Sequence, residues 1–356
     1  MAYTTVDDPS LYHQTLLYTG DGNDDRNLVN TGNSDLQPDW IWIKDRDNAR
    51  SHEIYDSSRG ATKRIQSDST GAESTQANNL QAFQSDGFQI GSGNGVNQAS
   101  QTLVAWQWKA NGGTTTSFSA SGAQLAGTRQ SNTTAGFSII TYTGDGNNNA
   151  TIPHGLSSPP KWVTIKELGA STNWYVGHNA TFGTGEVFLN NDSGIASAFG
   201  PFNKTAPDSN NITLGTDGNV NGNGDTYICY AFADVKGYSK FGSYEGIGGT
   251  SGGAFAYTGF QPAWLMYRNI DRTENWIIVD TKRGLFNRIA GENLQANVND
   301  AEANESRWGF DFLANGFKVR QTQSQNANNG DGETIIYMAF AERPFVSSKG
   351  VPGTAR

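Results

Sequence analysis

The side chains best suited to catalysis are four histidines and one cysteine, and they are scattered along the chain. His13, His52, His154 and His178 lie at unrelated places, and none belongs to a zinc-binding His-x-x-x-His or Glu-containing pattern. Cys229 is flanked by apolar residues, which is typical of an inert buried thiol. A hydrolase needs a nucleophile, a base and an orienting group brought together. The pattern therefore predicts no catalytic residues and a protein that is not an enzyme.

The loop that begins at Asp217 offers the best oxygen ligands for a metal. Residues 217–222 read Asp-Gly-Asn-Val-Asn-Gly, with Asp225 in the ninth place, and this matches the first half of a calcium loop. The twelfth place holds Ile228, where such a loop needs a bidentate Glu. A tight turn is the prediction, with a weak ion site as the alternative. Both interpretations also apply to the loop of Asp21, Asp24 and Asp25. We expect no metal and no cofactor.

Two turns carry an Asp and an Arg three residues apart, Asp56 with Arg59 and Asp280 with Arg283. A carboxylate and a planar guanidinium form well-oriented ion pairs, so this spacing predicts a structural ion pair in each turn. Ligand binding is the alternative. The middle of the chain has Gly-His-Asn over residues 177–179 in the corresponding region, so the pair is not a strict requirement for folding.

Aromatic residues are abundant, and their faces can stack on sugar rings or fill a core. Six of them recur at equivalent strand positions, and we expect these in the core: Trp40, Trp106, Trp162, Tyr230, Trp264 and Phe340. Three others are less tied to the strands and are candidates for an exposed partner or glycan surface: Trp174, Trp276 and Trp308.

One set of landmarks occurs three times in the same order. Tyr-Thr-Gly-Asp-Gly begins at Tyr18 and Tyr142, and a shortened Tyr-Glu-Gly begins at Tyr244. A Pro-x-Trp follows each of them and opens a short apolar strand that ends in a cation, at Trp40, Trp162 and Trp264. Repetition of this kind predicts similar structural units in tandem.

The apolar runs are short, rich in β-branched and aromatic residues, and separated by Gly, Asn or Asp, as in antiparallel sandwiches. We predict an all-β chain of three tandem antiparallel β-sandwich modules, jelly-roll-like, with short helical insertions and extended terminal arms. The predicted segments are an N-terminal arm (1–15), module 1 (16–112), a Gly/Ser/Thr-rich linker (113–135), module 2 (136–236), module 3 (237–346) and a C-terminal arm (347–356). We call 16–112, 136–236 and 237–346 the first, second and third repeat.

Three finer expectations concern helices, the linker and the arms. Apolar spacing favours a helix over Glu73–Phe83 and, more weakly, over 291–305. The linker composition predicts that the first repeat hinges, whereas the second and third repeats are joined directly. The arms have little apolar content, so we expect them to make contacts between subunits by segment exchange or strand addition.

Composition excludes several classes of protein. The 356 residues carry a formal net charge of −9, which disfavours binding to nucleic acid phosphates. Apolar residues make up 35% and aromatic residues 11% of the chain, enough to fill more than one core. No apolar run is long enough to span a membrane, and the N-terminus lacks the features of a signal peptide. A single cysteine excludes an intrachain disulfide.

Several long phrases carry a resemblance to a known family. They are Met1–Ser10, Leu36–Lys44, Gly237–Tyr244 and Pro344–Pro352. Together they resemble a family of virion-associated proteins that is widespread in tailed bacteriophages of marine bacteria, including cyanobacteria and pelagic alphaproteobacteria. The resemblance covers essentially the whole chain and implies a place in a phage particle. It implies no catalytic activity and assigns no binding residues.

These observations predict a non-enzymatic structural protein on the virion exterior, as a head decoration, head fibre or part of the tail apparatus, made in the host bacterial cytoplasm. Its expected partners are other virion proteins and further copies of itself, with a trimer favoured, and neither nucleic acid nor membrane. The alternative is a tail-fibre adhesin that recognises host-surface glycan. A third hypothesis, a polysaccharide depolymerase, lacks any acid pair that can be named.

Overall fold

The computed structural model describes residues 3–196, 200–249, 252–284, 291–304, 309–320 and 326–353, and β-strands dominate it. The prediction of an all-β chain is confirmed. The α-helices of the described residues are three short ones, α1 (Asn94–Asn97), α2 (Gly218–Asn221) and α3 (Asn326–Asn329). A 3₁₀ turn, η1 (Pro9–Leu11), precedes the first strand.

Three antiparallel sheets share one strand order, one sheet for each repeat, although the first strand begins within the segment predicted to be the N-terminal arm. The first contains β1 (His13–Thr19), β9 (Thr102–Trp108), β3 (Trp40–Asp45) and β4 (Glu53–Asp56). The second contains β12 (Phe137–Thr143), β18 (Thr226–Phe232), β14 (Trp162–Glu167) and β15 (Tyr175–His178). The third contains β19 (Ser239–Glu245), β27 (Thr334–Pro344), β21 (Phe260–Asn269) and β22 (Ile277–Asp280).

Further short strands extend or cover these sheets. The second sheet gains β10 (Thr116–Phe118) and β11 (Ala126–Asn132) beside β12, and β16 (Val187–Phe188) beside β15. The third gains β23 (Glu292–Gln295) and β24 (Ala303–Asn304). The small covering sheets are β2 (Arg26–Leu28), β8 (Phe88–Ile90) and β7 (Leu80–Phe83); β13 (Ala150–Pro153) and β17 (Asn211–Leu214); and β20 (Phe255–Tyr257), β26 (Gly316–Val319) and β25 (Phe310–Leu313). A two-stranded sheet pairs β5 (Lys63–Arg64) with β6 (Ser74–Thr75).

The pairing register is the same in all three sheets, so it defines equivalent positions. Trp40 lies opposite Trp108, Trp162 opposite Phe232, and Trp264 opposite Phe340. Two residues further into each closing strand, the equivalent positions are Trp106, Tyr230 and Met338.

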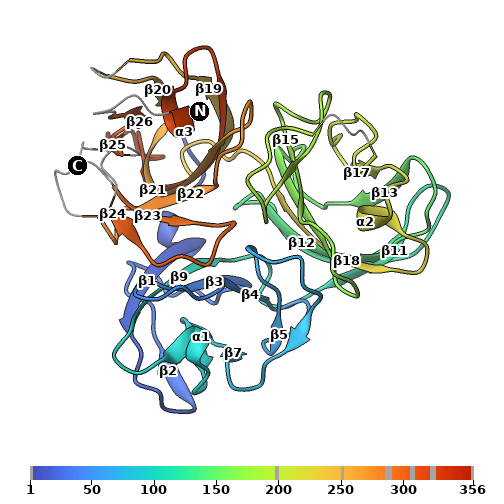
Figure 1. Ribbon diagram of the computed structural model, residues 1–356, viewed down its shortest axis with the longest axis horizontal. Helices are drawn as coiled ribbons and strands as arrows, with labels where there is room; N and C mark the ends of the chain where they lie inside the picture. Colours follow the sequence, from blue (N-terminus) through green and yellow to red (C-terminus); the bar gives the residue numbers. More distant parts are fainter. Residues whose placement is uncertain are drawn as a thin grey trace.

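Each main sheet is buried on both faces, which explains its nearly continuous apolar strands. One face packs on the small sheet of its own repeat, as Ile41 and Ile43 pack on Phe88 in the first repeat. The other face packs on the corresponding faces of the other two sheets in one shared core. Figure 1 shows the three repeats, blue, green and orange to red, arranged around a common centre. All six side chains expected in the core are buried: Trp40, Trp106, Trp162, Tyr230, Trp264 and Phe340.

Aromatic rings from all three repeats meet at this centre. The Phe340 ring lies 5.6 Å from Trp108 of the first repeat and 5.8 Å from Phe232 of the second, between ring centroids. Trp264 lies 5.4 Å from Trp108, edge to face. Such contacts add to the free energy gained by burying the rings.

The hinge expected for the first repeat is wrong, because its Trp residues lie in the core that all three repeats share. The segment expected to be a linker, 113–135, contains β10 and β11, which continue the second sheet. Glycine and threonine composition indicated flexibility there, but main-chain pairing with β12 orders the segment.

The helix expected over Glu73–Phe83 is also wrong. This segment contains β6 and β7, and β7 pairs with β8 while Leu80 is buried beneath the first sheet. The second expected helix, over 291–305, is replaced in its described part by β23 and β24. Long-range strand pairing overrides local apolar spacing in both cases.

Both arms pack against their own chain. The Thr4 hydroxyl donates to the Lys236 carbonyl (2.8 Å), and Val6 is buried in the shared core. The Ser348 amide donates to Asp7 (2.7 Å), which joins the two arms. The described parts of both arms therefore contact their own chain, and the contacts expected between subunits stay a prediction.

Replacing Phe340 with Ala should reduce the free energy of unfolding by about 3–5 kcal/mol, because it leaves a cavity where the three repeats meet. Chemical denaturation monitored by tryptophan fluorescence measures the loss. The control is Val351→Ala at an exposed position, which should change it by less than about 0.5 kcal/mol. Equal effects of both substitutions would contradict a shared core.

Candidate functional site

Both Asp–Arg turns form buried ion pairs that also link neighbouring repeats. In the first repeat, Asp56 accepts a hydrogen bond from Arg59 Nε (2.5 Å). The same carboxylate oxygen accepts one from the Tyr230 hydroxyl of the second repeat (2.7 Å). The Arg59 guanidinium also contacts Glu73 (3.1 Å). We call this contact region the first–second junction.

The equivalent pair joins the third repeat to the first. Asp280 accepts from Arg283 Nε (2.6 Å) and from the indole Nε1 of Trp106 (3.0 Å). Arg283 also contacts Glu302 (2.8 Å). Burial alone would raise the pKa of Asp280, but the charge of Arg283 and these hydrogen bonds hold that pKa below its usual value. The carboxylate is therefore ionised and serves the third–first junction.

The second repeat lacks the pair for a reason that lies in its neighbour. Its equivalent of Asp56 and Asp280 is His178. The position equivalent to Tyr230 and Trp106 is Met338 in the third repeat, which has no N–H or O–H to donate. A buried carboxylate without a donor would be costly, so the second–third junction has no carboxylate at this point.

Three ring nitrogens at equivalent positions each donate a hydrogen bond to a main-chain carbonyl of a neighbouring repeat. Trp174 Nε1 of the second repeat donates to the Gln66 carbonyl of the first (2.9 Å). Trp276 Nε1 of the third donates to the Phe188 carbonyl of the second (2.7 Å). Trp174 and Trp276 are buried, so the expectation that they form an exposed partner or glycan surface is wrong. The remaining candidate, Trp308, lies outside the described residues.

His52 is the third member of this set, and its tautomer follows from its contacts. Trp42 Nε1 donates to His52 Nδ1 (2.7 Å), so Nδ1 is unprotonated. Nε2 therefore carries the hydrogen and donates to the Gln295 carbonyl of the third repeat (3.0 Å). Burial lowers the pKa of His52 to about 3, which keeps the ring neutral.

The acidic loops considered for calcium are occupied by internal hydrogen bonds. Asp217 accepts from the Asn219 amide (2.9 Å) and caps α2. Asn97 donates to Asp21 (3.0 Å), and Asn221 makes the equivalent contact with Asp145 (3.4 Å). Among the residues that the structure describes, no three His, Cys, Asp or Glu side chains are grouped to hold a metal ion.

The cations that end the first strand after each Pro-x-Trp are buried and bind main-chain carbonyls. Lys44 Nζ donates to the Asp45 carbonyl (2.5 Å), and Lys166 Nζ to the Glu167 carbonyl (2.7 Å). Arg268 Nη1 donates to the Phe188 carbonyl (2.9 Å). Burial lowers the pKa of both lysines to about 8. Sequence reasoning noted these cations but not their roles: the two lysines fix the loop that follows their own strand, and Arg268 binds the second repeat.

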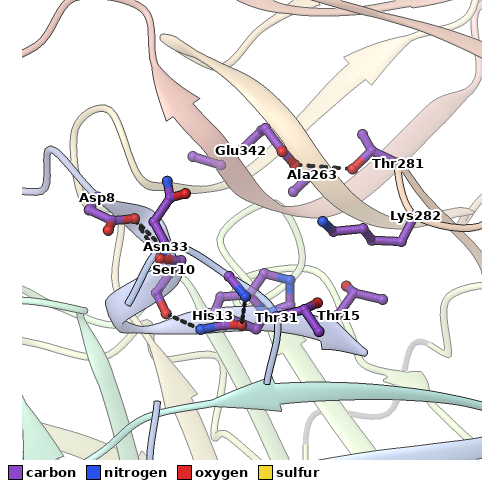
Figure 2. A pocket seen from close by; sticks show the side chains of 13 residues that line it. Asp8, Ser10, His13, Thr15, Thr31, Asn33, Ala263, Thr281, Lys282 and Glu342 are labelled. Carbon is purple, nitrogen blue, oxygen red and sulfur yellow. Dashed lines mark hydrogen bonds between the residues drawn. The ribbon is translucent and has the colours of Figure 1, made fainter. Parts of the chain in front are cut away.

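A polar cavity of about 130 Å³ lies at the third–first junction. Figure 2 shows it between the N-terminal arm and first repeat on one side and the third repeat on the other. Its lining includes Ser10, His13 and Thr15 from one side, and Thr281, Lys282 and Glu342 from the other. This is the candidate functional site.

His13 is the unusual residue of the cavity. Its ring stacks on Phe340 (5.2 Å between centroids), and Nδ1 lies 3.0 Å from the Gln107 carbonyl. A carbonyl is only an acceptor, so Nδ1 carries the hydrogen and Nε2 is an acceptor. Nε2 is buried and has no hydrogen-bond partner among the residues that the structure describes. Burial lowers the pKa of His13 to about 4.

The charged groups of the cavity differ in the hydrogen bonds that they form. Asp8 accepts from the Ser10 hydroxyl (2.6 Å) and the Ser34 hydroxyl (2.8 Å). Glu342 accepts from the Thr281 hydroxyl (3.1 Å). Lys282 is exposed and its ammonium group makes no hydrogen bond within the described residues. No sequence motif unites these residues, because they come from both ends of the chain and meet only in the folded protein.

The fold and the site together define an all-β protein whose three similar sheets close around one aromatic core. The chain belongs to the family of the domain of unknown function DUF7483, which matches residues 8–344. No curated protein matches the chain. None of the helices in the described part has the length and apolarity that crossing a membrane requires.

Replacing Asp280 with Ala should reduce the free energy of unfolding by about 3–5 kcal/mol, because Arg283 stays buried without its main partner. Thermal and urea denaturation measure the change. Asp311→Ala is the matched control, since it removes an exposed pair with Arg320 and should cost at most about 1 kcal/mol. A loss below 1 kcal/mol for both would show that the junction does not depend on the ion pair.

The lowered pKa of His13 should make the free energy of unfolding depend on pH. Its pKa is about 4 in the folded chain and 6.5 when unfolded, so the unfolded chain binds more protons between these values. Stability is therefore lost as pH falls from 6.5 to 4. His13→Phe, which copies the equivalent Phe137, should reduce the loss of stability between pH 7 and pH 4.5 by about 2 kcal/mol. Urea denaturation at pH 7 and pH 4.5 provides the comparison, and parallel profiles would contradict the assignment.

Proposed function

We propose that this protein is a non-enzymatic structural component of a bacteriophage virion, exposed on the particle exterior. It would serve as a head decoration, head fibre or tail-apparatus component, after synthesis in the host cytoplasm. The four phrases that resemble virion-associated proteins support this proposal. Its partners would be other virion proteins and further copies of itself.

The observation that carries the proposal is the closure of three repeats around one aromatic core. We interpret each repeat as a β-sandwich module made of its main sheet and its small sheet, over 16–112, 136–236 and 237–346, with β10 and β11 added to the second. The inner faces of all three modules are buried against one another. Such a block has little freedom to deform, which suits a protein whose task is to hold a shape on a particle surface.

A non-enzymatic role is supported by the use that the fold makes of its reactive groups. Asp56 and Asp280 accept hydrogen bonds from a neighbouring repeat, and His52 donates one. Cys229 is buried, and burial raises the pKa of its thiol. A buried, protonated thiol is a poor nucleophile.

The adhesin alternative loses its main support. It relied on aromatic rings exposed to glycan, and two of the three candidates, Trp174 and Trp276, lie in the core. The trimer stays a prediction, as do the contacts between subunits expected of the arms.

Purified particles of a marine phage that encodes this chain provide the test. We expect mass spectrometry to find the protein in gradient-purified particles, and a gold-labelled antibody to bind many sites on intact particles. An antibody against an internal capsid protein is the control and should label only disrupted particles. Absence from purified particles would contradict the proposal, and labelling confined to fibre tips would favour the adhesin.

A further inference from the structure

We propose that the cavity at the third–first junction receives an extended peptide strand from a partner protein, which pairs with the free edge of β1. This inference goes beyond the proposed virion role and does not depend on it. The ligand is defined by its chemistry: an extended main chain with a carboxylate placed to meet Lys282.

The edge of β1 has main-chain groups ready to pair. In the described residues β1 pairs only with β9. The carbonyl of Tyr12 and the amide of Gly20 bond toward the β9 side, so the even-numbered residues of β1 face β9. The N–H and C=O groups of His13, Thr15 and Leu17 therefore point away from β9. His13 and Thr15 line the cavity, so part of this free edge lies within it.

The second repeat shows the same edge with a strand in place. β12 is equivalent to β1, and β11 pairs along its whole length, from Asn132 opposite Phe137 to Ala126 opposite Thr143. The chain itself thus contains an example of a short, polar, extended segment added at this position. The added strand lies at the first–second junction, as the cavity lies at the third–first junction.

The third repeat covers its equivalent edge by other means. The Phe241 amide of β19 donates to the Asp234 carboxylate (2.8 Å), and Val235 bonds to the main chain of Ser239. At the equivalent edge of β1, Arg26 Nη1 donates to the Thr19 carbonyl (2.6 Å), but within the described residues no added strand or cap covers the main-chain groups of His13, Thr15 and Leu17. Free edges of this kind are sites for strand addition.

One side chain of β11 indicates which side chain an incoming strand should carry in the cavity. Gln130 reaches across the first–second junction and donates to the hydroxyls of Ser57 (2.8 Å) and Ser58 (2.7 Å). The positions equivalent to these serines are Thr281 and Lys282, which line the cavity. A lysine ammonium is only a donor, so the incoming residue must offer an acceptor, and a carboxylate fits best.

His13 adds a second requirement. Its buried Nε2 is an acceptor with no partner in the described part of the chain, and His13 is equivalent to Phe137, which lies opposite Asn132 of β11. A side chain with an N–H or O–H at the place of Asn132 would satisfy this nitrogen. The preferred strand therefore carries a carboxylate at the place of Gln130 and an amide or hydroxyl two residues later, at the place of Asn132.

A synthetic peptide copying residues 124–134 with Gln130→Glu is the probe, and the full chain is the receptor. Hydrogen exchange should show slower exchange of the Thr15 and Leu17 amides when the peptide is added. Leu17→Pro removes one outward N–H without breaking a bond to β9, and it should abolish this protection and the binding measured by calorimetry. Ser243→Pro is the matched control, because it makes the same change at the equivalent exposed position of β19 and should leave binding intact.

Exchanging the charges of Lys282 and of the peptide residue that meets it separates recognition of the peptide from any effect on folding. The peptide with Glu should bind wild type about fivefold more tightly than the same peptide with Lys at that place, and Lys282→Glu should reverse the preference. No protection at millimolar peptide, or equal loss of binding in Leu17→Pro and Ser243→Pro, would overturn the proposal. Protection that rises with protein concentration alone would place a second copy of this chain on the edge and would also overturn it.

Discussion

Burial of three aromatic sheet faces against one another is the constraint on which the rest of this structure depends. Each repeat can cover one face of its main sheet with its own small sheet, but the other face needs the two remaining repeats. An isolated repeat would expose rings such as Trp108 and Phe340 to water. The repeats therefore form one block, in which the three repeats are arranged in a circle around the shared core.

This circular arrangement explains where the repeats differ in sequence. The centre is filled by rings of similar size. At each junction, by contrast, the residue on one side of the boundary between two repeats is matched to the residue on the other side. An acceptor, Asp56 or Asp280, is present where the neighbour supplies a Tyr hydroxyl or a Trp indole. Where the neighbour supplies Met338, the acceptor is absent. Asp56 and Asp280 thus each meet a donor of the neighbouring repeat, as a buried carboxylate requires.

The same departures from symmetry produce the cavity. At the first–second junction the slot beside β12 is filled by β11, and at the second–third junction Asp234 and Val235 cover the edge. At the third–first junction the residues before β1 run instead toward the boundary between the second and third repeats, where the Thr4 hydroxyl donates to the Lys236 carbonyl. The edge of β1 and Lys282 therefore line one cavity, beside the buried ring of His13.

The amino-acid pattern by itself determined the strand-rich class, the three repeats, the buried Trp40, Trp162 and Trp264, and the ion pairs of the two Asp–Arg turns. These features rest on local periodicity and on short spacings that a single segment contains. Only the tertiary structure decided that Trp174 and Trp276 are buried and that residues 113–135 form strands. Their partners lie in other repeats, and a local pattern carries no record of which distant face will cover it.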